Sequence, residues 1–174
     1  RELVVDGDGD RLVIVCPDRP GLFSRVAGVL ALNGLSVLDA SVATVEGLMV
    51  DEFRVEWAFG DPIPWTKVER DLRRALVGRF ALEPRLAERA RSYRRPRISA
   101  HAFEPNVRVL DDASDDATVI EVFGSDDVGL LFRLARALTD LDLDIRRAKV
   151  STIGAEVVDA FYVNDAFGNK LDKP

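Results

Sequence analysis

The sequence predicts two small α+β domains in tandem, each with an antiparallel sheet that is covered by helices on one face. The first observation is an internal repeat within the 174 residues: a shift of 108 places aligns residues 18–55 with residues 126–163 without a gap, and 14 of the 38 aligned positions are identical. Chance gives about two or three identities at average composition. The second observation is that each copy contains one helical pattern between strand-like patterns.

Each copy opens with a predicted hairpin. The apolar runs at 11–16 and 117–123 read as strands, and each follows a turn-rich acidic stretch, at 7–10 and at 111–116. A further short apolar run precedes each acidic stretch, which completes the hairpin pattern.

A helix of about three turns follows in each copy. In the first copy the helical apolar spacing begins at Leu22 and stops at Asn33-Gly34, and in the second copy it begins at Leu130. Asp142 stands where the first copy has Gly34. Aspartate accepts a left-handed helix end, although less readily than glycine.

Two strands and a second helix complete the first copy. Residues 36–45 are small or β-branched, residues 49–57 alternate apolar with charged side chains, and a helical pattern starts near Pro64. This order matches the ferredoxin-like βαββαβ plan. We expect a first domain at 1–80 and a second at 105–174. The second copy is truncated, because it reaches Leu171 before a second helix begins, so its missing parts are absent, disordered or supplied by another chain.

The segment between the two domains, 81–104, is rich in arginine. We interpret it as a solvated linker that is helical at most from Pro84 to Arg94. Docking of this linker on an acidic or phosphate-bearing partner is the alternative.

Composition excludes several functions. Apolar residues make up 47% and charged residues 31%, as in globular proteins, and 30 acidic against 24 basic residues give a net charge of −6. The chain would therefore be repelled by nucleic acid and by anionic membranes. With no membrane-length apolar stretch and no signal sequence, a cytoplasmic location is expected. The single cysteine, Cys16, lies in the apolar run 12–16 and reads as a core residue. A start at Arg1 and a stop at Pro174 indicate a fragment of something longer.

No catalytic or metal-binding pattern is visible. His101 is the only histidine and has no recognisable partner, so a histidine-based metal cluster is excluded. No phosphate-binding glycine loop or nucleophile elbow occurs. We expect no catalytic residue and no cofactor in this chain.

The candidate ligand site is the loop between the first strand and the first helix. Its residues are Asp18, Arg19, Pro20, Gly21 and Leu22, and the second copy repeats Asp126, Gly129 and Leu130 at the same spacing. Asp18 can cap the helix, and the glycine leaves peptide N–H groups free at the positive end of the helix dipole, which suits a carboxylate. The alternative is an ordinary helix start. Asp51 and Asp159 also recur, each on the apolar face of a strand, where a carboxyl group needs a hydrogen-bond partner; we favour a structural role over ligand contact.

These residues carry a family resemblance. The segment Asp18 to Leu22, the helix to Gly34, residues 40–44 and residues 51–55 together resemble an ACT domain. The second copy, at 126–130, 144–152 and 158–163, resembles another. The last run is similar to the final ACT domain of bacterial protein-PII uridylyltransferases.

The resemblance implies a function. In that family a nucleotidyltransferase domain, which uses Mg²⁺ and a nucleotide, and a metal-dependent hydrolase domain lie upstream, and the ACT pair senses glutamine. This chain would then bind glutamine and switch the parent enzyme between modifying and demodifying the PII signalling protein. Two alternatives stay open: a ligand-free ACT module that assembles several copies, and a freestanding ACT-repeat regulator.

The second copy departs from the family pattern. It has Asp127-Val128 where the first copy has Arg19-Pro20. Loss of proline removes a rigid turn element, and the added carboxylate should repel an anionic ligand. If only one copy binds, we expect it to be the first.

Overall fold

The first copy of the repeat folds as two hairpin strands, a helix, two strands and a helix. A computed structural model describes residues 3–60, 62–93, 104–153 and 156–172. The first-copy elements are β1 (Val4–Asp8), β2 (Arg11–Pro17), α1 (Leu22–Leu32), β3 (Leu35–Val45), β4 (Leu48–Trp57) and α2 (Trp65–Leu76). His101 and the arginines at 94, 95 and 97 lie outside the described residues.

The second copy repeats this order as far as its last strand. Its elements are β5 (Asn106–Leu110), β6 (Thr118–Ser125), α4 (Leu130–Asp140), β7 (Asp144–Ile153) and β8 (Glu156–Asn164). The described residues after β8 contain no second helix.

The connecting segment contains the helix α3 (Leu82–Ser92). The interpretation of this segment as a solvated linker is wrong for these residues. Leu82 and Leu86, one turn apart, are only 8% and 5% exposed and belong to the core, so α3 packs on the domains rather than merely joining them.

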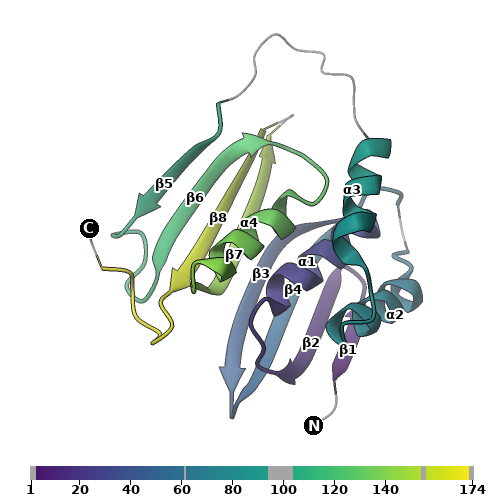
Figure 1. The fold of residues 1–174 in the computed structure, drawn as a ribbon, viewed down its shortest axis with the longest axis horizontal. Helices are drawn as coiled ribbons and strands as arrows, with labels where there is room; N and C mark the ends of the chain where they lie inside the picture. Colours follow the sequence, from purple (N-terminus) through teal and green to yellow (C-terminus); the bar gives the residue numbers. More distant parts are fainter. Residues whose placement is uncertain (1–2, 61, 94–103, 154–155, 173–174) are drawn as a thin grey trace.

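Both copies share one antiparallel sheet. Its strand order is β1-β2-β4-β3-β7-β8-β6-β5, and β3 of the first copy pairs with β7 of the second through Asp39–Lys149, Ala40–Ala148 and Ser41–Arg147. The helices lie on one face of this sheet (Figure 1). The predicted fold class is confirmed. The strand beside β2 comes from the opening hairpin, before β2, rather than from a strand after the second helix.

Local geometry confirms the repeat. A β-bulge lies between Val37 and Asp39 in β3 and another between Ile145 and Arg147 in β7, and these positions are related by the shift of 108. Gly34 and Asp142 end the two helices with φ values of 75° and 58°. Asp142 therefore takes the predicted left-handed conformation.

The core lies between the sheet and the helices. Phe53 on β4 is fully buried and packs on Phe23 of α1 with ring centroids 5.3 Å apart. Phe161, the repeat equivalent of Phe53, is also fully buried. Burial of one such side chain contributes about 1.5–3 kcal/mol. None of the described helices has the length and apolar character to cross a membrane.

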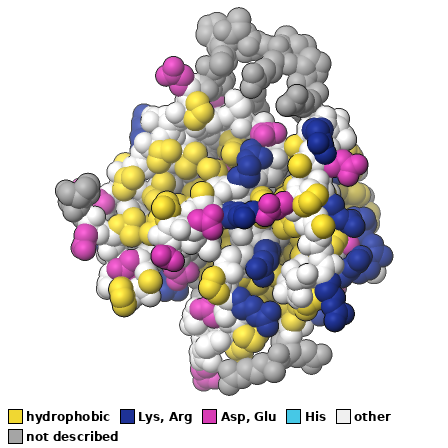
Figure 2. Space-filling model, in the orientation of Figure 1, with side chains coloured by type: hydrophobic (Ala, Val, Ile, Leu, Met, Phe, Trp, Pro, Cys, Tyr) yellow, Lys and Arg dark blue, Asp and Glu magenta, His cyan; other side chains and the backbone are white. Residues whose placement is uncertain are grey.

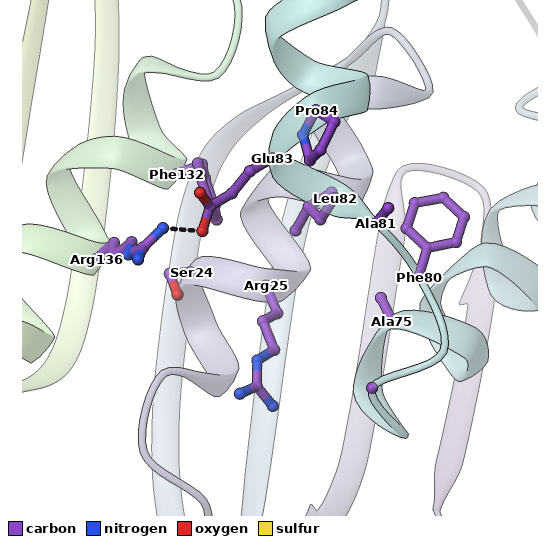
Figure 3. A pocket seen from close by; sticks show the side chains of 11 residues that line it. Ser24, Arg25, Ala75, Phe80, Ala81, Leu82, Glu83, Pro84, Phe132 and Arg136 are labelled. Atoms are coloured by element: carbon purple, nitrogen blue, oxygen red, sulfur yellow. Dashed lines mark hydrogen bonds and ion pairs between the residues drawn. The ribbon is translucent and has the colours of Figure 1, made fainter.

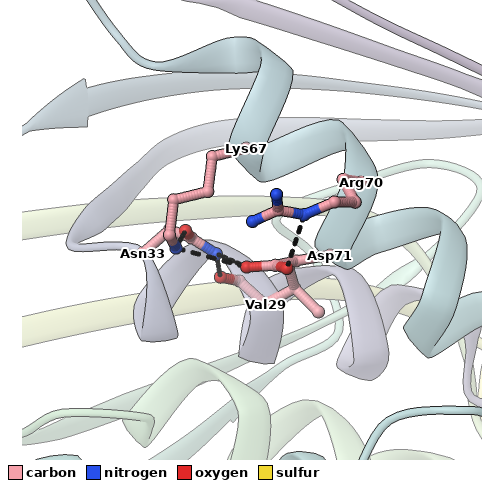
Figure 4. Close-up of polar contacts among 5 residues, drawn as sticks. All are labelled: Val29, Asn33, Lys67, Arg70 and Asp71. Atoms are coloured by element: carbon pink, nitrogen blue, oxygen red, sulfur yellow. Dashed lines mark hydrogen bonds and ion pairs between the residues drawn. The ribbon is translucent and has the colours of Figure 1, made fainter.

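A polar cluster fastens the end of α1 to α2 (Figure 4). Asn33 donates from Nδ2 to Val29 O at 3.0 Å and to Asp71 Oδ2 at 3.3 Å. Lys67 contacts both Asn33 Oδ1 and Asp71. At the position of Asn33 the second copy has Leu141, which is 68% exposed. The cluster thus belongs to the first domain.

The second domain is less covered than the first. Trp65 of α2 lies over β1, where a Cβ on Gly7 would come within 2.3 Å of its ring, and Val5 is only 4% exposed. In β5, Val107 and Val109 are each 59% exposed. Hydrophobic side chains are accordingly visible over β5 and β6 (Figure 2).

Two of the buried aspartates among the described residues lie on the sheet and face the core. Asp51 on β4 is 0% exposed and Asp159 on β8 is 2% exposed. Both oxygens of Asp51, and Oδ1 of Asp159, lack a hydrogen-bond partner among the described residues. Burial is the main cause that raises the pKa of each to about 7. Each aspartate therefore costs stability wherever it is ionised.

We expect Gly28→Leu to destabilise the packing between the helices. A Cβ at this position of α1 would lie 2.7 Å from Leu82 of α3 and 2.9 Å from Phe132 of α4. Overpacking of this kind lowers the free energy of unfolding by about 1–3 kcal/mol, measured by urea denaturation. Gly124→Leu is the control, because a Cβ there meets nothing within 4 Å. An equal loss in both variants would contradict the close packing.

We expect Asp51→Asn to stabilise the chain more at pH 8 than at pH 5. The pKa of Asp51 is about 7 in the folded chain against an ordinary value of 3.8, so the unfolded chain releases this proton first and the wild type loses stability as pH rises between these values. The gain in unfolding free energy should grow by about 2–3 kcal/mol between pH 5 and pH 8, measured by urea denaturation. The exposed Asp6→Asn variant is the control. A gain that does not change with pH would contradict the buried protonated carboxyl.

Candidate ligand-binding site

Each candidate loop ends in a left-handed glycine that starts a helix. Gly21 (φ 76°, ψ 12°) is the N-cap of α1, and Gly129 (φ 77°, ψ 14°) is the N-cap of α4. Neither helix has a side-chain cap, so the predicted capping role of Asp18 is wrong. Glycine adopts this conformation with little strain. Gly21 is itself the N-cap residue, and Asp18 lies three residues before it.

Free amides lie at the start of α1. The Leu22 N–H donates to Arg19 O at 3.3 Å, and the Arg25 N–H donates to Gly21 O at 3.2 Å. The amides of Phe23 and Ser24, between these two, have no acceptor among the described hydrogen bonds. They lie at the positive end of the helix dipole, where an anion is stabilised.

The first loop is open and borders the second domain. Asp18, Arg19 and Pro20 are exposed. A Cβ on Gly21 would meet only Ser24 Oγ at 3.7 Å and Thr139 Cγ2 at 3.9 Å, and Thr139 belongs to α4. The docking of the two domains thus places the end of α4 beside this loop.

The glycine of the second loop is covered, whereas Asp126 and Asp127 are exposed. Gly129 is buried, and a Cβ there would meet Leu86 of α3 at 3.6 Å. Arg133 donates to Asp127 Oδ2 at 3.0 Å and to Val128 O at 3.1 Å. The Asp127 carboxylate therefore has a cationic partner, which offsets part of the expected repulsion of an anionic ligand.

Carboxyl groups from both domains lie near the first loop. The charge of Asp18 is one cause that raises the pKa of Asp51, after burial, and Asp144 is another. The pKa of Asp144 is itself raised by burial and by Asp18, while Arg146 lowers it. Asp144 is the first residue of β7, so it comes from the second domain. Its repeat equivalent in the first domain is Ser36, so the second loop lacks this carboxylate.

Asp51 and Cys16 lie on the buried side of this region. Cys16 is buried and free, as predicted. Burial and the charge of Asp51 raise the pKa of its thiol, so Cys16 stays protonated and behaves as an apolar residue. The described residues include no group of three or more ligating side chains that could hold a metal ion.

The structure brings the predicted residues of the first loop together with two that sequence reasoning missed, Thr139 and Asp144. Neither residue carries a sequence signal, because the repeat places an alanine and a serine at their positions in the first copy. Residues 18–22 and 126–130 line neither a cavity of about 480 Å³ nor one of about 290 Å³, but Ser24 lines the larger one. Because Asp18, Arg19 and Pro20 are exposed, a ligand at the first loop would bind at the surface beside the second domain.

Known proteins resemble both copies. A family model described as "ACT domain" matches residues 11–56, and one described as "ACR family N-terminal ACT domain" matches residues 113–173. Three relatives bear the name bifunctional uridylyltransferase/uridylyl-removing enzyme. Identity is 39% over 172 residues with the Rhodospirillum rubrum protein, 40% over 166 with that of Novosphingobium aromaticivorans, and 41% over 170 with that of Streptomyces coelicolor.

These matches cover 92–94% of this chain but only 18–20% of each relative. The chain thus spans about a fifth of the length of the relatives that it matches. The two matched regions lie in the two halves of the shared sheet, one on each side of the β3–β7 pairing. The chain therefore belongs to the ACT domain family, as two tandem regulatory ACT domains related to a segment of bifunctional uridylyltransferase/uridylyl-removing enzymes.

Proposed function

We propose that the chain senses an amino acid at the first glycine loop. The observation that carries this proposal is that hydrogen-bond donors and carboxylates lie close together where the two domains meet. The free amides of Phe23 and Ser24 suit a carboxylate, while Asp18 and Asp144 suit an ammonium group. An α-amino acid carries both groups on one carbon atom.

The proposed ligand is glutamine, and the proposed output is control of a parent enzyme. The relationship to uridylyltransferase/uridylyl-removing enzymes supports this assignment. By that relationship the parent modifies and demodifies the PII signalling protein in the cytoplasm, with Mg²⁺ and nucleotide bound by its catalytic domains and not by this chain.

The proposed switch acts on domain docking. A ligand that contacts the first loop and β7 together is bound more tightly when the two domains are docked than when they are apart. Its effect is limited by this difference in affinity. The second loop, whose glycine is covered, has no counterpart of Asp144, so we assign one site per chain.

A ligand-free assembly module is the second candidate function. The observation that favours it is the apolar surface of the edge strand β5, where Val107 and Val109 are exposed. Sedimentation of the chain with and without glutamine distinguishes the two: a sensor responds to the amino acid, whereas an assembly module associates without it.

We expect Gly21→Ala to weaken glutamine binding by about tenfold or more. Alanine at φ 76° is strained by about 1–2 kcal/mol, and relief of this strain displaces the loop amides. Gly9→Ala is the matched control, because Gly9 also has a positive φ and an added Cβ would meet nothing within 4 Å. Gly9 lies in the β1–β2 turn, before β2, whereas the candidate loop follows β2. Isothermal titration calorimetry measures both. Absence of glutamine binding by the wild type would refute the assignment.

We expect Asp144→Asn to weaken glutamine binding by about tenfold, because it removes a charge-assisted contact to the ammonium group. The variant should leave the fold intact, since Asp144 is exposed and its ion pair with Arg146, at 3.4 Å, lies at the surface. Asp140→Asn, at the exposed end of α4, is the control. Equal affinity of the wild type and Asp144→Asn would place the site within the first domain alone.

A further inference from the structure

A cavity beside the first glycine loop lies within the helical layer (Figure 3), and Ser24 and Arg25 at the start of α1 line it. Its volume is about 480 Å³, within the usual range of small-molecule sites. Three parts of the chain form its walls: α1 and the end of α2 from the first domain, the segment 80–84 that leads into α3, and α4 from the second domain. Its apolar lining includes Ala75, Leu82, Pro84 and Phe132.

One arginine that lines this cavity, Arg25, has no ion-pair partner in the part of the chain that the structure describes. Arg25 and Arg133 are equivalent and identical in the repeat. Arg133 is paired with Asp127, but the first copy has Arg19 at the position of Asp127, and Arg25 makes no ion pair with any described residue. Its guanidinium is therefore available to an anion.

A second cation lines the cavity from the other domain. Arg136 of α4 contacts Glu83 of the connecting segment, and both side chains are about half exposed. Figure 3 shows this contact at the cavity wall between α4 and α3. An exposed ion pair of this kind contributes little stability, so an anionic ligand can compete with Glu83 for Arg136.

The surroundings add positive charge. Arg74 and Arg85 lie over the ring of Phe80, at 5.8 and 4.6 Å from its centroid, and Phe80 lines the cavity. Lys and Arg side chains gather on this side of the molecule (Figure 2), although the net charge of the chain is −6. The electrostatic potential near the cavity therefore favours an anion, although the net charge of the chain is negative.

We propose that this cavity is a second ligand site, which binds a small organic anion, a carboxylate or phosphate ester with an apolar body. Arg25 holds the anionic group, Arg136 lines the cavity from the second domain, and the apolar lining receives the rest of the ligand (Figure 3). Because Arg25 belongs to the first domain and Arg136 to the second, the occupant links the two domains across the helical layer. Ser24, whose amide is part of the amino-acid site proposed above, also lines this cavity, so the two sites adjoin and are tested by separate titrations.

The test is calorimetric titration of the chain with phenyl phosphate and with benzoate, which distinguish the two anionic groups. Benzyl alcohol tests the apolar body alone, and inorganic phosphate tests the charge alone. We expect saturable binding of at least one aromatic anion, with an affinity at least tenfold higher than that for benzyl alcohol or inorganic phosphate. The affinity should fall as the salt concentration rises.

Variants assign the binding to the cavity. Arg25→Gln should weaken binding at least tenfold, whereas the repeat-equivalent Arg133→Gln should leave it unchanged; Glu83→Gln should tighten it several-fold by freeing Arg136. Arg25→Lys keeps the charge and should give an intermediate loss of affinity. It takes the place of Arg25→Gln if thermal unfolding shows that the Gln variant is not folded. Failure of both aromatic anions to bind, or equal losses in the Arg25 and Arg133 variants, would overturn the proposal. Glutamine binding is measured in parallel and tests the proposed function, so failure of one proposal can be told apart from failure of the other.

Discussion

The pairing of β3 with β7 is the contact on which the rest of the structure depends. Each copy of the repeat alone would expose the edge of a four-stranded sheet, with a row of unpaired N–H and C=O groups. The three residue pairs around Ala40 and Ala148 join these edges and turn two small sheets into one. The same pairing brings α1 beside α4 and places the first glycine loop at the end of α4. Without it, neither the loop site nor the cavity between the helices would contain residues from both domains.

The two copies share a fold but differ at several positions of the two proposed sites. Arg19 aligns with Asp127 in the repeat, and among the described residues Arg133 has an ion-pair partner whereas Arg25 has none. Gly28 and Arg136 are also equivalent: glycine lets α3 and α4 approach α1 closely, and arginine adds a cation to the same interface. The two loops also differ at their glycines, because Gly129 is buried beside Leu86 of α3 whereas Gly21 is half-buried. The two copies therefore present different surfaces at equivalent loops.

Both copies of the repeat have a buried aspartate that lowers the stability of the folded chain when it is ionised. Asp51 and Asp159 occupy equivalent positions on the helix-facing side of the sheet, and an unpartnered carboxyl in such a place destabilises the folded chain once it ionises. The sequence interpretation of a hydrogen-bonded structural role is not supported for Asp51, because the described residues provide no partner. Burial and the charges of Asp18 and Asp144 near the first loop instead raise the pKa of Asp51 to about 7 and so favour its neutral form.

The sequence by itself determined the elements and the loops. Local rules govern these features: apolar periodicity set the helices and strands, and Gly21, Gly34 and Asp142 marked turns that need a left-handed residue. Only the tertiary structure decided which parts of the two copies meet. The β3–β7 pairing, the burial of Leu82 and Leu86, and the approach of Asp144 to the first loop depend on surfaces far apart in the chain. No periodicity or spacing within one copy encodes such contacts, because their free energy arises only when both domains are folded and docked.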